Sequence, residues 1–302
     1  METNILLESG TGEVEILEFV INNKHYGINV IKVKEVLETD NLTKLPQAPP
    51  TIAGLILNRN EIITLVNLKY VLEKDFEVSK QNTIILCEFN KSRVAFNIDR
   101  VVGTHRIGWN KITKPDNIFA DSLVIGNIIL NDKILLLLDF EKIVTDINPK
   151  VGISEERIQN VEYKDRSNIK LMLADDSFLI RSLLKDTLTK AGFSNLSFFD
   201  DGEQALNCLY DLVEKKKEKF IEEVQILITD IEMPRLDGHT LTRRIKEHKI
   251  LRNLPVIIFS SLITDDLFHK GVSVGADAQM SKPEIDNLVK LIDKFMTKNT
   301  DH

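Results

Sequence analysis

Four short apolar runs in the second half of the chain each lead straight into polar residues that could do chemistry. The residues that follow these runs are Asp175-Asp176, Asp230, Ser260-Ser261 and Lys282-Pro283. If the runs are parallel strands, their carboxyl ends meet at one edge of a sheet, which is where open α/β sheets bind ligands. Aspartates gathered at that edge would repel one another unless a cation were present. The pattern therefore predicts a cation site.

The ligand types indicate which cation and which chemistry to expect there. A few carboxylate oxygens suit Mg²⁺, which keeps several waters and often takes phosphate as a co-ligand. Lys282 supplies a flexible positive charge that can pair with phosphate, and Ser260 supplies a hydroxyl donor. The set is suited to placing a phosphoryl group on Asp230, with the cation and Lys282 neutralising the transferring oxygens.

Elements of two kinds alternate in this half and would position those residues. The apolar runs that we interpret as strands are 169–174, 224–229, 256–259 and 278–281. After the first of them, leucines between Leu179 and Leu188 recur at helical spacing, and Gly192 is a plausible helix stop. Strands that alternate with helices favour a parallel sheet covered on both faces.

The motifs LADDS, LITDIEMPRLDG, PVIIFSS and MSKP, in this order and with GADA before the last, resemble the response-regulator receiver domain over about residues 168–296. The resemblance implies a doubly wound α/β fold with a five-stranded parallel sheet, in which Asp230 accepts a phosphoryl group from the phosphohistidine of a partner kinase. The implied ligands of Mg²⁺ are Asp175, Asp176, Asp230 and the backbone carbonyl of Glu232. The implied contacts of the phosphoryl group are Ser260 and Lys282.

Such receivers catalyse only their own phosphorylation and dephosphorylation, so the resemblance predicts no other enzymatic activity. Gln279 departs from the pattern, because many receivers carry there an aromatic residue that swings inward on activation. Each motif also has a purely structural interpretation. The aspartate pair 175–176 could cap a helix, the pairs 233–234 and 237–238 could form turns, and 282–283 could be a plain loop. A receiver fold with an inactive site is a further alternative.

The first half has a different pattern, with short apolar runs separated by turn residues. The runs are 15–21, 61–68, 83–89, 93–98, 123–130 and 133–139. Strands at this spacing, with one or two short helical stretches, predict an all-β sandwich or barrel. Residues 148–167 carry no sustained periodicity, which predicts a first domain at 1–147, a linker at 148–167 and a second domain at 168–302.

The order EFVINNKHYGINVIKVKEVL, LPQAPPTIAGLILNRNEIITLVNL, RVAFNIDRVVG and IGNIILNDKILLLLDFEKIV resembles the CheW-type coupling domain. The resemblance implies two small β-barrels that link chemoreceptors to the histidine kinase CheA. The stretch 57–60 stands where the family often has Asn-Leu-Arg-Gly, and Arg59 matches in place. Arg59, Val33 and Glu35 are therefore expected near partner surfaces. The alternative is that Val33 and Val36 belong to the core and that the two charged residues are ordinary solvated ones.

Composition limits the other functions that the chain could have. The net charge is −7, and the first 150 residues hold 17 basic and 20 acidic residues, so neither half has the basic surface that binds nucleic acid. The basic run 215–219 is diluted by glutamate and is typical of a solvated helix end. Cys87 and Cys208 lie in opposite halves, which disfavours a disulfide or a cysteine metal site. The apparent absence of a leader or a long apolar span predicts a cytoplasmic protein without membrane insertion.

No catalytic set is apparent in the first half. His25 and His105 are isolated in sequence, and a lone histidine is more often structural than a ligand. Trp109 is most simply a partly buried packing residue. The first half is therefore expected to bind partners rather than to catalyse a reaction.

A CheW-like domain followed by a receiver is the arrangement of CheV-type chemotaxis coupling proteins. The implied function is an adaptor between chemoreceptors and a CheA-type kinase, regulated by phosphorylation of Asp230. One alternative is a receiver that serves chiefly as a phosphate sink for the kinase. Another is a phosphatase with an aspartyl-phosphate intermediate, for which Glu232 would be the candidate acid or base.

Overall fold

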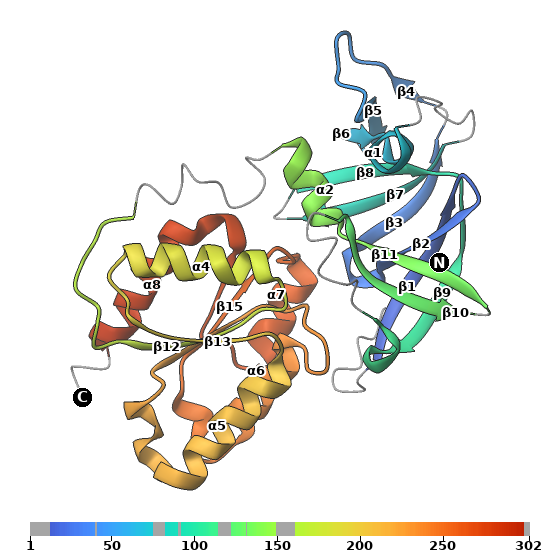
Figure 1. Cartoon of the computed structure of the whole chain (residues 1–302). Coiled ribbons are helices and arrows are strands. Elements are labelled where there is room, and N and C mark those ends of the chain that lie inside the picture. The colour runs from blue at the N-terminus through green and yellow to red at the C-terminus, as the bar shows by residue number, and fades with distance from the viewer. Residues whose placement is uncertain are drawn as a thin grey trace. The chain divides into compact units, whose positions relative to one another are not determined.

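The computed structural model describes residues 13–39, 41–74, 82–89, 92–113, 122–130, 132–148 and 161–298. Contacts divide these residues into two compact units, a strand-rich one that begins at Glu13 and one from Val161 onward in which helices flank a sheet (Figure 1). Residues 149–160 of the predicted linker lie outside the described ranges. The predicted domain boundaries therefore remain a prediction.

The first unit consists of two largely antiparallel sheets. Its strands are β1 (Glu13–Ile21), β2 (Lys24–Asn29), β3 (Val33–Thr39), β4 (Leu42–Thr43), β5 (Ile52–Asn58), β6 (Glu61–Val66), β7 (Asn82–Phe89), β8 (Ser92–Ile98), β9 (Arg100–Gly108), β10 (Val124–Leu130) and β11 (Lys133–Leu138). One sheet has the order β10-β11-β2-β1-β9 and the other has the order β3-β7-β8-β6-β5-β4. The predicted β-rich fold is confirmed.

A hairpin followed by a short helix occurs twice in this unit, which the sequence analysis missed. The hairpin β5-β6 leads into α1 (Leu68–Glu73), and β10-β11 leads into α2 (Phe140–Ile147). Residues 52–72 and 124–144 align without a gap. The register shifts at Gly54 in one copy and at Gly126 in the other. Asn67 and Asp139 cap the two helices by accepting a hydrogen bond from a backbone N–H.

Aromatic and aliphatic side chains fill the core of the first unit. Phe140 at the start of α2 packs edge-on against Phe96, with ring centroids 4.7 Å apart, and against Phe19 at 6.1 Å. Trp109 is half-buried against the aliphatic cluster that includes Ile16 and Ile107. The interpretation of Trp109 as a packing residue is confirmed.

The second unit is a five-stranded parallel sheet. Its strands are β12 (Lys170–Ala174), β13 (Asn195–Phe199), β14 (Ile226–Thr229), β15 (Val256–Ser260) and β16 (Ala278–Ser281), in the order β13-β12-β14-β15-β16. Its helices are α4 (Phe178–Lys190), α5 (Gly202–Lys216), α6 (Gly238–Glu247), α7 (Asp265–Ser273) and α8 (Ile285–Lys298). Figure 1 shows α4 and α8 on one side of the sheet and α5 and α6 on the other. The predicted doubly wound parallel sheet is confirmed.

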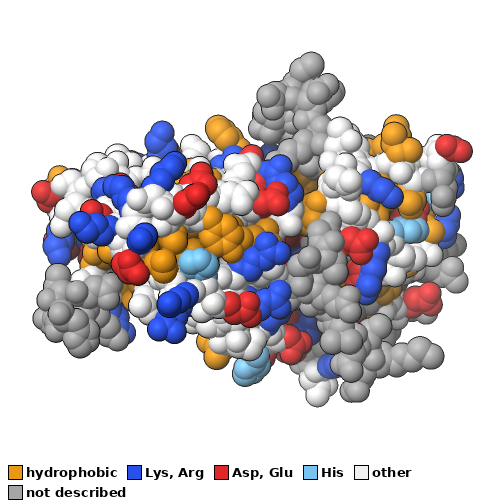
Figure 2. All heavy atoms as spheres, turned by 90° about the horizontal axis from the view of Figure 1, so that it is seen from below, with side chains coloured by type: hydrophobic (Ala, Val, Ile, Leu, Met, Phe, Trp, Pro, Cys, Tyr) orange, Lys and Arg blue, Asp and Glu red, His pale blue; other side chains and the backbone are white. Residues whose placement is uncertain are grey.

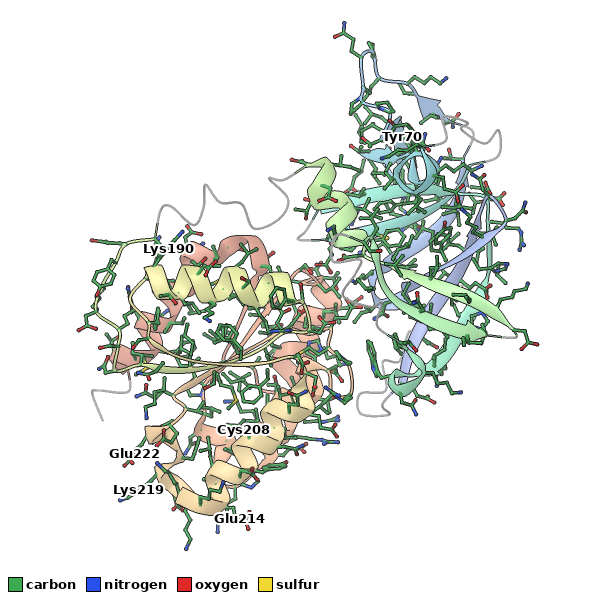
Figure 3. The ribbon with its side chains drawn as sticks, viewed as in Figure 1. Tyr70, Lys190, Cys208, Glu214, Lys219 and Glu222 are labelled. Atoms are coloured by element: carbon green, nitrogen blue, oxygen red, sulfur yellow. The ribbon has the colours of Figure 1, made fainter. Side chains whose placement is uncertain are left out.

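Two details of this unit bear on the sequence analysis. Strand β13 was missed, because its residues 195–199 mix polar and aromatic side chains without a clear apolar run. The basic run does form a solvated helix end, since residues 214–219 at the end of α5 and the start of the 3-10 turn η5 (Lys217–Glu222) are exposed. Figure 3 shows Glu214, Lys219 and Glu222 at the outer end of this segment.

Candidate functional site

The predicted site lies at the carboxyl edge of the parallel sheet. Asp175 and Asp176 follow β12, and Asp230 follows the neighbouring strand β14. The backbone N–H of Asp230 donates to the carbonyl of Ala174 over 2.9 Å, which extends the pairing of the two strands to the site itself. Neighbouring parallel strands therefore bring the aspartates together, as the sequence pattern predicts.

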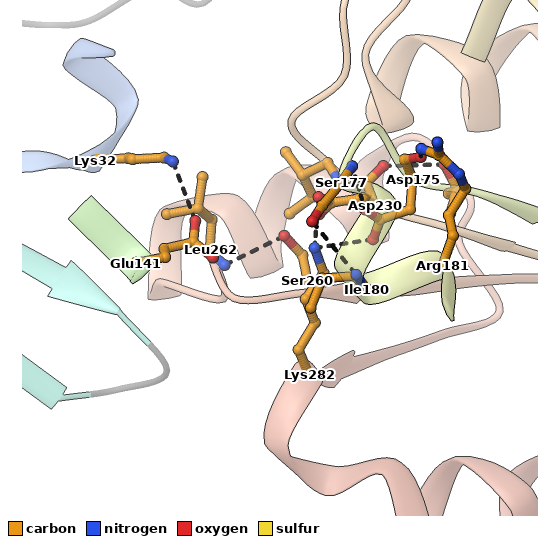
Figure 4. A network of polar contacts seen from close by, with 12 residues as sticks. Lys32, Glu141, Asp175, Ser177, Ile180, Arg181, Asp230, Ser260, Leu262 and Lys282 are labelled. Carbon is orange, nitrogen blue, oxygen red and sulfur yellow. Dashed lines mark hydrogen bonds and ion pairs between the residues drawn. The ribbon is translucent and has the colours of Figure 1, made fainter. Parts of the chain in front are cut away.

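The three aspartates and Lys282 form one charged cluster. Asp175, Asp176 and Asp230 each offer an oxygen atom, and these oxygens all lie within 4.8 Å of one another. Lys282 Nζ lies 2.9 Å from Asp175 Oδ2 and 2.8 Å from Asp230 Oδ2 (Figure 4). Both of these aspartates and Lys282 are buried, whereas Asp176 is half-buried. The donor set is oxygen only and fits a hard divalent cation.

The pKa shifts of the cluster show how its charges are balanced. Burial raises the pKa of Asp175 to about 6 although the ammonium group of Lys282 opposes the rise, and the charge of Asp230 adds to it. Burial also raises the pKa of Asp176 well above its ordinary value, and the neighbouring carboxylates add to the rise. The cluster holds more negative charge than Lys282 compensates, and a bound cation would supply the missing positive charge.

Backbone and side-chain donors fix the carboxylates. Asp175 Oδ1 accepts from the N–H of Ser177 over 2.9 Å, and Asp230 Oδ1 accepts from the N–H of Ile231 over 2.7 Å. Arg181 on α4 donates to the carbonyl of Asp175 over 2.5 Å, a contact that the sequence analysis missed. The sequence did hold a signal for this contact. Arg181 lies one turn inside the helix that Ser177 caps, which brings it back toward the aspartate pair.

Gly238 lets the helix α6 begin directly against Asp230. A Cβ atom at position 238 would lie 1.9 Å from the carbonyl oxygen of Asp230, so no larger residue fits without moving the backbone. Asp237 caps the same helix by accepting from the N–H of Thr240 over 3.0 Å. Asp237 therefore caps α6, and Gly238 allows its backbone to approach that of Asp230. The pair does more than form the turn that was the structural alternative for it.

The remaining predicted residues of the site lie at the same edge. Ser260 ends β15, the strand beside β14, and its Oγ accepts from the N–H of Leu262 over 3.2 Å. Glu232 lies two residues after Asp230 and is half-buried, and its charge contributes to the raised pKa of Asp176. The predicted roles of Ser260 and of the Glu232 carbonyl stay predictions.

Two of the residues expected on the partner surface of the first unit, Glu35 and Arg59, meet at the turn between β5 and β6. Glu35 Oε1 accepts from the side-chain amide of Asn58 over 2.6 Å, and Arg59 lies 3.0 Å from Glu35 Oε2. Arg59 is 81% exposed, so it is available to a partner. Val33 starts β3 and is half-buried, whereas Val36 is 43% exposed and does not belong to the core.

The two histidines that appear isolated in sequence meet at one buried carboxylate. His25 Nδ1 contacts one oxygen of Glu18, and His105 Nε2 lies 2.5 Å from the other. Burial pushes the pKa of Glu18 upward, but the hydrogen bonds from both imidazoles outweigh this and lower the pKa. Glu18 on β1 is paired with Gly27 on β2 and with Gly103 on β9, the strands that carry the two histidines. The sequence analysis missed this cluster because it depends on strand register. The group is a satisfied structural cluster.

Comparison with known proteins assigns both units. Residues 15–148 match the family model of the CheW-like domain, and residues 171–293 match that of the response regulator receiver domain. The chain therefore carries a CheW-like domain followed by a receiver domain. Within the described ranges, no helix is both long enough and apolar enough to cross a membrane.

The relatives share one or both domains with this chain. The chemotaxis protein CheV3 of Helicobacter pylori is 29% identical over 302 residues, covering 95% of this chain and 96% of that protein. The chemotaxis protein CheW of Thermotoga maritima is 29% identical over 143 residues, covering 47% of this chain and 94% of that protein. The solved structure of the scaffolding protein TtCheW from Thermoanaerobacter tengcongensis is 26% identical and covers 42% of this chain and 84% of that one, with a TM-score of 0.39. A CheW-like domain followed by a receiver is the CheV-type arrangement.

Charged side chains of both signs share one face of the molecule. On the face that Figure 2 shows, Lys and Arg side chains are interspersed with Asp and Glu side chains among scattered apolar ones. This mixture matches the near balance of 39 basic and 46 acidic residues in the chain. Among the side chains described on that face, the basic ones form no continuous patch.

Proposed function

We propose that the chain is a chemotaxis coupling adaptor, and that phosphorylation of Asp230 regulates its coupling. The CheW-like domain would bind a chemoreceptor and a CheA-type histidine kinase in the cytoplasm. The observation that carries the proposal is the charged cluster of Asp175, Asp176, Asp230 and Lys282 in a chain whose other domain is CheW-like. A site of this charge has no evident use in a passive linker.

The cluster suits phosphoryl transfer from a phosphohistidine to Asp230. The N–P bond of the donor breaks as a carboxylate oxygen of Asp230 forms the new O–P bond, and the imidazole leaves. Lys282 already lies 2.8 Å from Asp230 Oδ2, so it can stay paired with the oxygens that carry the transferred charge. Ser260 would supply a hydroxyl donor to the phosphoryl group.

Mg²⁺ is the cofactor that fits this site. The proposed ligands are Asp175, Asp176, Asp230 and the backbone carbonyl of Glu232. When bound, the ion neutralises charge on the phosphoryl oxygens during transfer. The raised pKa values of Asp175 and Asp176 support this assignment, because they indicate negative charge in excess of Lys282.

The proposed partner surface of the CheW-like domain includes the turn around Arg59. Next to this turn, Leu57 and Ile62 are paired across the hairpin and are 66% and 73% exposed. Exposed apolar pairs beside a charged group are typical of a protein interface rather than of a solvated loop. Arg59, Glu35 and Val33 would lie on or near the surface that meets the kinase or the receptor.

Charge reversal at Arg59 tests the adaptor role. We expect Arg59→Glu to weaken co-sedimentation with a receptor and a CheA-type kinase, because it removes an exposed contact and its ion pair with Glu35. The double variant Arg59→Glu with Glu35→Arg restores the ion pair but not a partner contact, so it should stay defective. Arg106→Glu is the matched control, because Arg106 forms a similar exposed pair with Glu15 elsewhere in the domain. Equal binding by all variants would contradict the assignment of this surface.

A further inference from the structure

The loop between β14 and α6 closes into a tight turn directly after Asp230. The N–H of Gly238 donates to the carbonyl of Ile231 over 3.0 Å, and Met233 inside the turn is buried. Glu232, whose backbone carbonyl is a proposed Mg²⁺ ligand, lies in the same turn. The conformation of this turn therefore determines where that carbonyl lies.

Arg235 in this turn has a backbone conformation that few residues other than glycine adopt. Its φ is 63°, in the left-handed region, where an arginine costs free energy. Its side chain is 49% exposed, so burial of apolar surface does not offset that cost. A specific contact must therefore stabilise the turn in this conformation.

The guanidinium group of Arg235 contacts a buried carboxylate at the start of α5. It forms an ion pair with Asp201, whose side chain is fully buried, and lies 3.8 Å from Asp200 Oδ1. Beside this pair, a Cβ atom at position 202 would lie 2.3 Å from the carbonyl oxygen of Leu236. The turn therefore packs against the start of α5 at two neighbouring points.

Asp201 has hydrogen-bond donors besides Arg235. Its Oδ1 accepts from the N–H of Gln204 over 2.8 Å, which caps α5, and its Oδ2 accepts from the side-chain amide of Gln204 over 2.8 Å. These bonds satisfy the cap of the helix by themselves. What the ion pair adds is a link from α5 to the turn, so its loss should not unfold the receiver.

We propose that Arg235 is a positioning residue that fixes the turn carrying Glu232, and that it thereby sets the affinity of the site for Mg²⁺. This inference rests on the proposed function and adds a residue outside the proposed ligand set. Loss of a group that supports a metal ligand commonly weakens metal binding by about 10- to 100-fold. Because Arg235 acts through the backbone of the turn, we expect the lower end of this range.

Arg235→Asn distinguishes positioning from a plain charge effect. Asparagine tolerates the left-handed conformation but removes the positive charge. Loss of a nearby positive charge would by itself make Mg²⁺ bind more tightly, whereas a loosened turn makes it bind more weakly. We expect titration calorimetry of the full chain with Mg²⁺ to show about 10-fold weaker binding. Arg235→Lys keeps the charge and should restore part of the affinity.

Asp201→Asn tests the other side of the ion pair, because asparagine caps a helix as well as aspartate does. It should also weaken Mg²⁺ binding, and the double variant with Arg235→Asn should bind no more weakly than the weaker single variant. Lys216→Met is the matched control, because Lys216 pairs with Glu223 at the opposite end of α5. It should leave the affinity for Mg²⁺ unchanged.

Phosphotransfer from a CheA-type kinase gives a second readout. The Mg²⁺ concentration that gives half of the maximal labelling rate should rise in Arg235→Asn, whereas the maximal rate at saturating Mg²⁺ should equal that of the wild type. A lower maximal rate with an unchanged half-saturating concentration would contradict the role of Arg235.

The possible outcomes separate this inference from the proposed function. Normal Mg²⁺ binding by the wild type, with equal or tighter binding by Arg235→Asn, would overturn only the role of Arg235. An equal loss of affinity in Lys216→Met would do the same. Failure of the wild type to bind Mg²⁺ would instead overturn the proposed function, and with it the positioning role.

Discussion

Buried carboxylates occur in both domains, but their electrostatic surroundings are opposite. In the CheW-like domain, Glu18 has an imidazole at each of its two oxygens, and its pKa is lowered. In the receiver, Asp175 is buried among other carboxylates, and burial together with the charge of Asp230 raises its pKa to about 6. The first arrangement is stable as it stands, whereas the second is costly until a cation binds.

The difference separates a cluster whose charges are balanced from one whose charges are not. A chain gains nothing in stability from gathering aspartates at one sheet edge, so such a cluster indicates a ligand. The two histidines lie on the strands that flank the glutamate strand, and both contact one glutamate. This arrangement satisfies the polar groups of a β-sheet core and indicates no ligand. The charge balance around a buried carboxylate therefore distinguishes the two cases better than the mere presence of histidine or aspartate does.

The largest effect on stability is expected from Lys282→Met in the receiver. Lys282 is buried and lies within 3 Å of Asp175 and Asp230, so its removal leaves their charges uncompensated. Loss of one partner of a buried ion pair costs about 3–5 kcal/mol. We expect a decrease of this size in the free energy of unfolding of the metal-free protein, followed by circular dichroism.

Mg²⁺ should restore part of that loss, because it brings positive charge to the same carboxylates. As a matched control, Lys246→Met removes a lysine that pairs with Asp277 near the surface. It should cost less, and its cost should not depend on Mg²⁺. A cost for Lys282→Met that is equally insensitive to Mg²⁺ would contradict the view that the carboxylates repel one another.

Glu18→Gln should destabilise the CheW-like domain by about 1–3 kcal/mol, because it leaves two imidazoles without their charged acceptor. Trp109 is the only tryptophan in the chain and lies in this domain, so its fluorescence reports the unfolding of this domain alone. Glu15→Gln, on the same strand, removes an exposed pair with Arg106 and should have little effect. Equal stability of the Glu18 and Glu15 variants would show that the cluster does not stabilise the domain.

Asp176→Asn should have the smallest effect and the opposite sign. The substitution removes one of the mutually repelling charges, so the metal-free receiver should gain stability on the order of 1 kcal/mol. The same variant should bind Mg²⁺ more weakly, and saturating Mg²⁺ should make the wild type the more stable of the two. Thermal unfolding with and without the ion, followed by circular dichroism, measures both effects.

The pH dependence follows from the same shifts. The pKa of Asp175 is raised from 3.8 to about 6, so the folded metal-free receiver binds protons more tightly than the unfolded chain. This group therefore lowers stability above pH 6 and does so less as the pH falls toward 3.8. Glu18 has a lowered pKa, so its contribution is present above the unfolded value of 4.5 and is lost on acidification. Because other carboxyl groups also titrate in each domain, each wild-type domain is compared with its own variant. Asp175→Asn and Glu18→Gln should change the slope of stability against pH in opposite directions near pH 4.5, and changes of the same sign would contradict the comparison.

Much of the receiver could be predicted from sequence because its site follows local rules. Four of the five strands end at or directly before a residue of the site, so the positions of Asp230 and Lys282 follow from the topology. The close approach of Gly238 to Asp230 was missed, because a backbone contact leaves no pattern in one sequence. The contact of Arg181 with the carbonyl of Asp175 was also missed, although helical spacing was an available signal for it.

The CheW-like domain was harder to predict, because its contacts depend on strand register. The cluster at Glu18 joins His25 and His105, which lie 7 and 87 residues away from it in the chain. No periodicity marks such a meeting. The repeated hairpins were missed, although residues 52–72 and 124–144 align without a gap. The matching register shifts at the two glycines make the repeat plain.

Phosphotransfer from a CheA-type kinase tests the central claim most directly. Wild type and Asp230→Asn are incubated with the radiolabelled kinase and Mg²⁺, and label on each protein is measured over time. The account predicts rapid labelling of the wild type, loss of labelling in Asp230→Asn, and loss of wild-type labelling when EDTA removes the cation. Equal labelling of the two proteins would contradict the assignment of Asp230 as the phosphoacceptor.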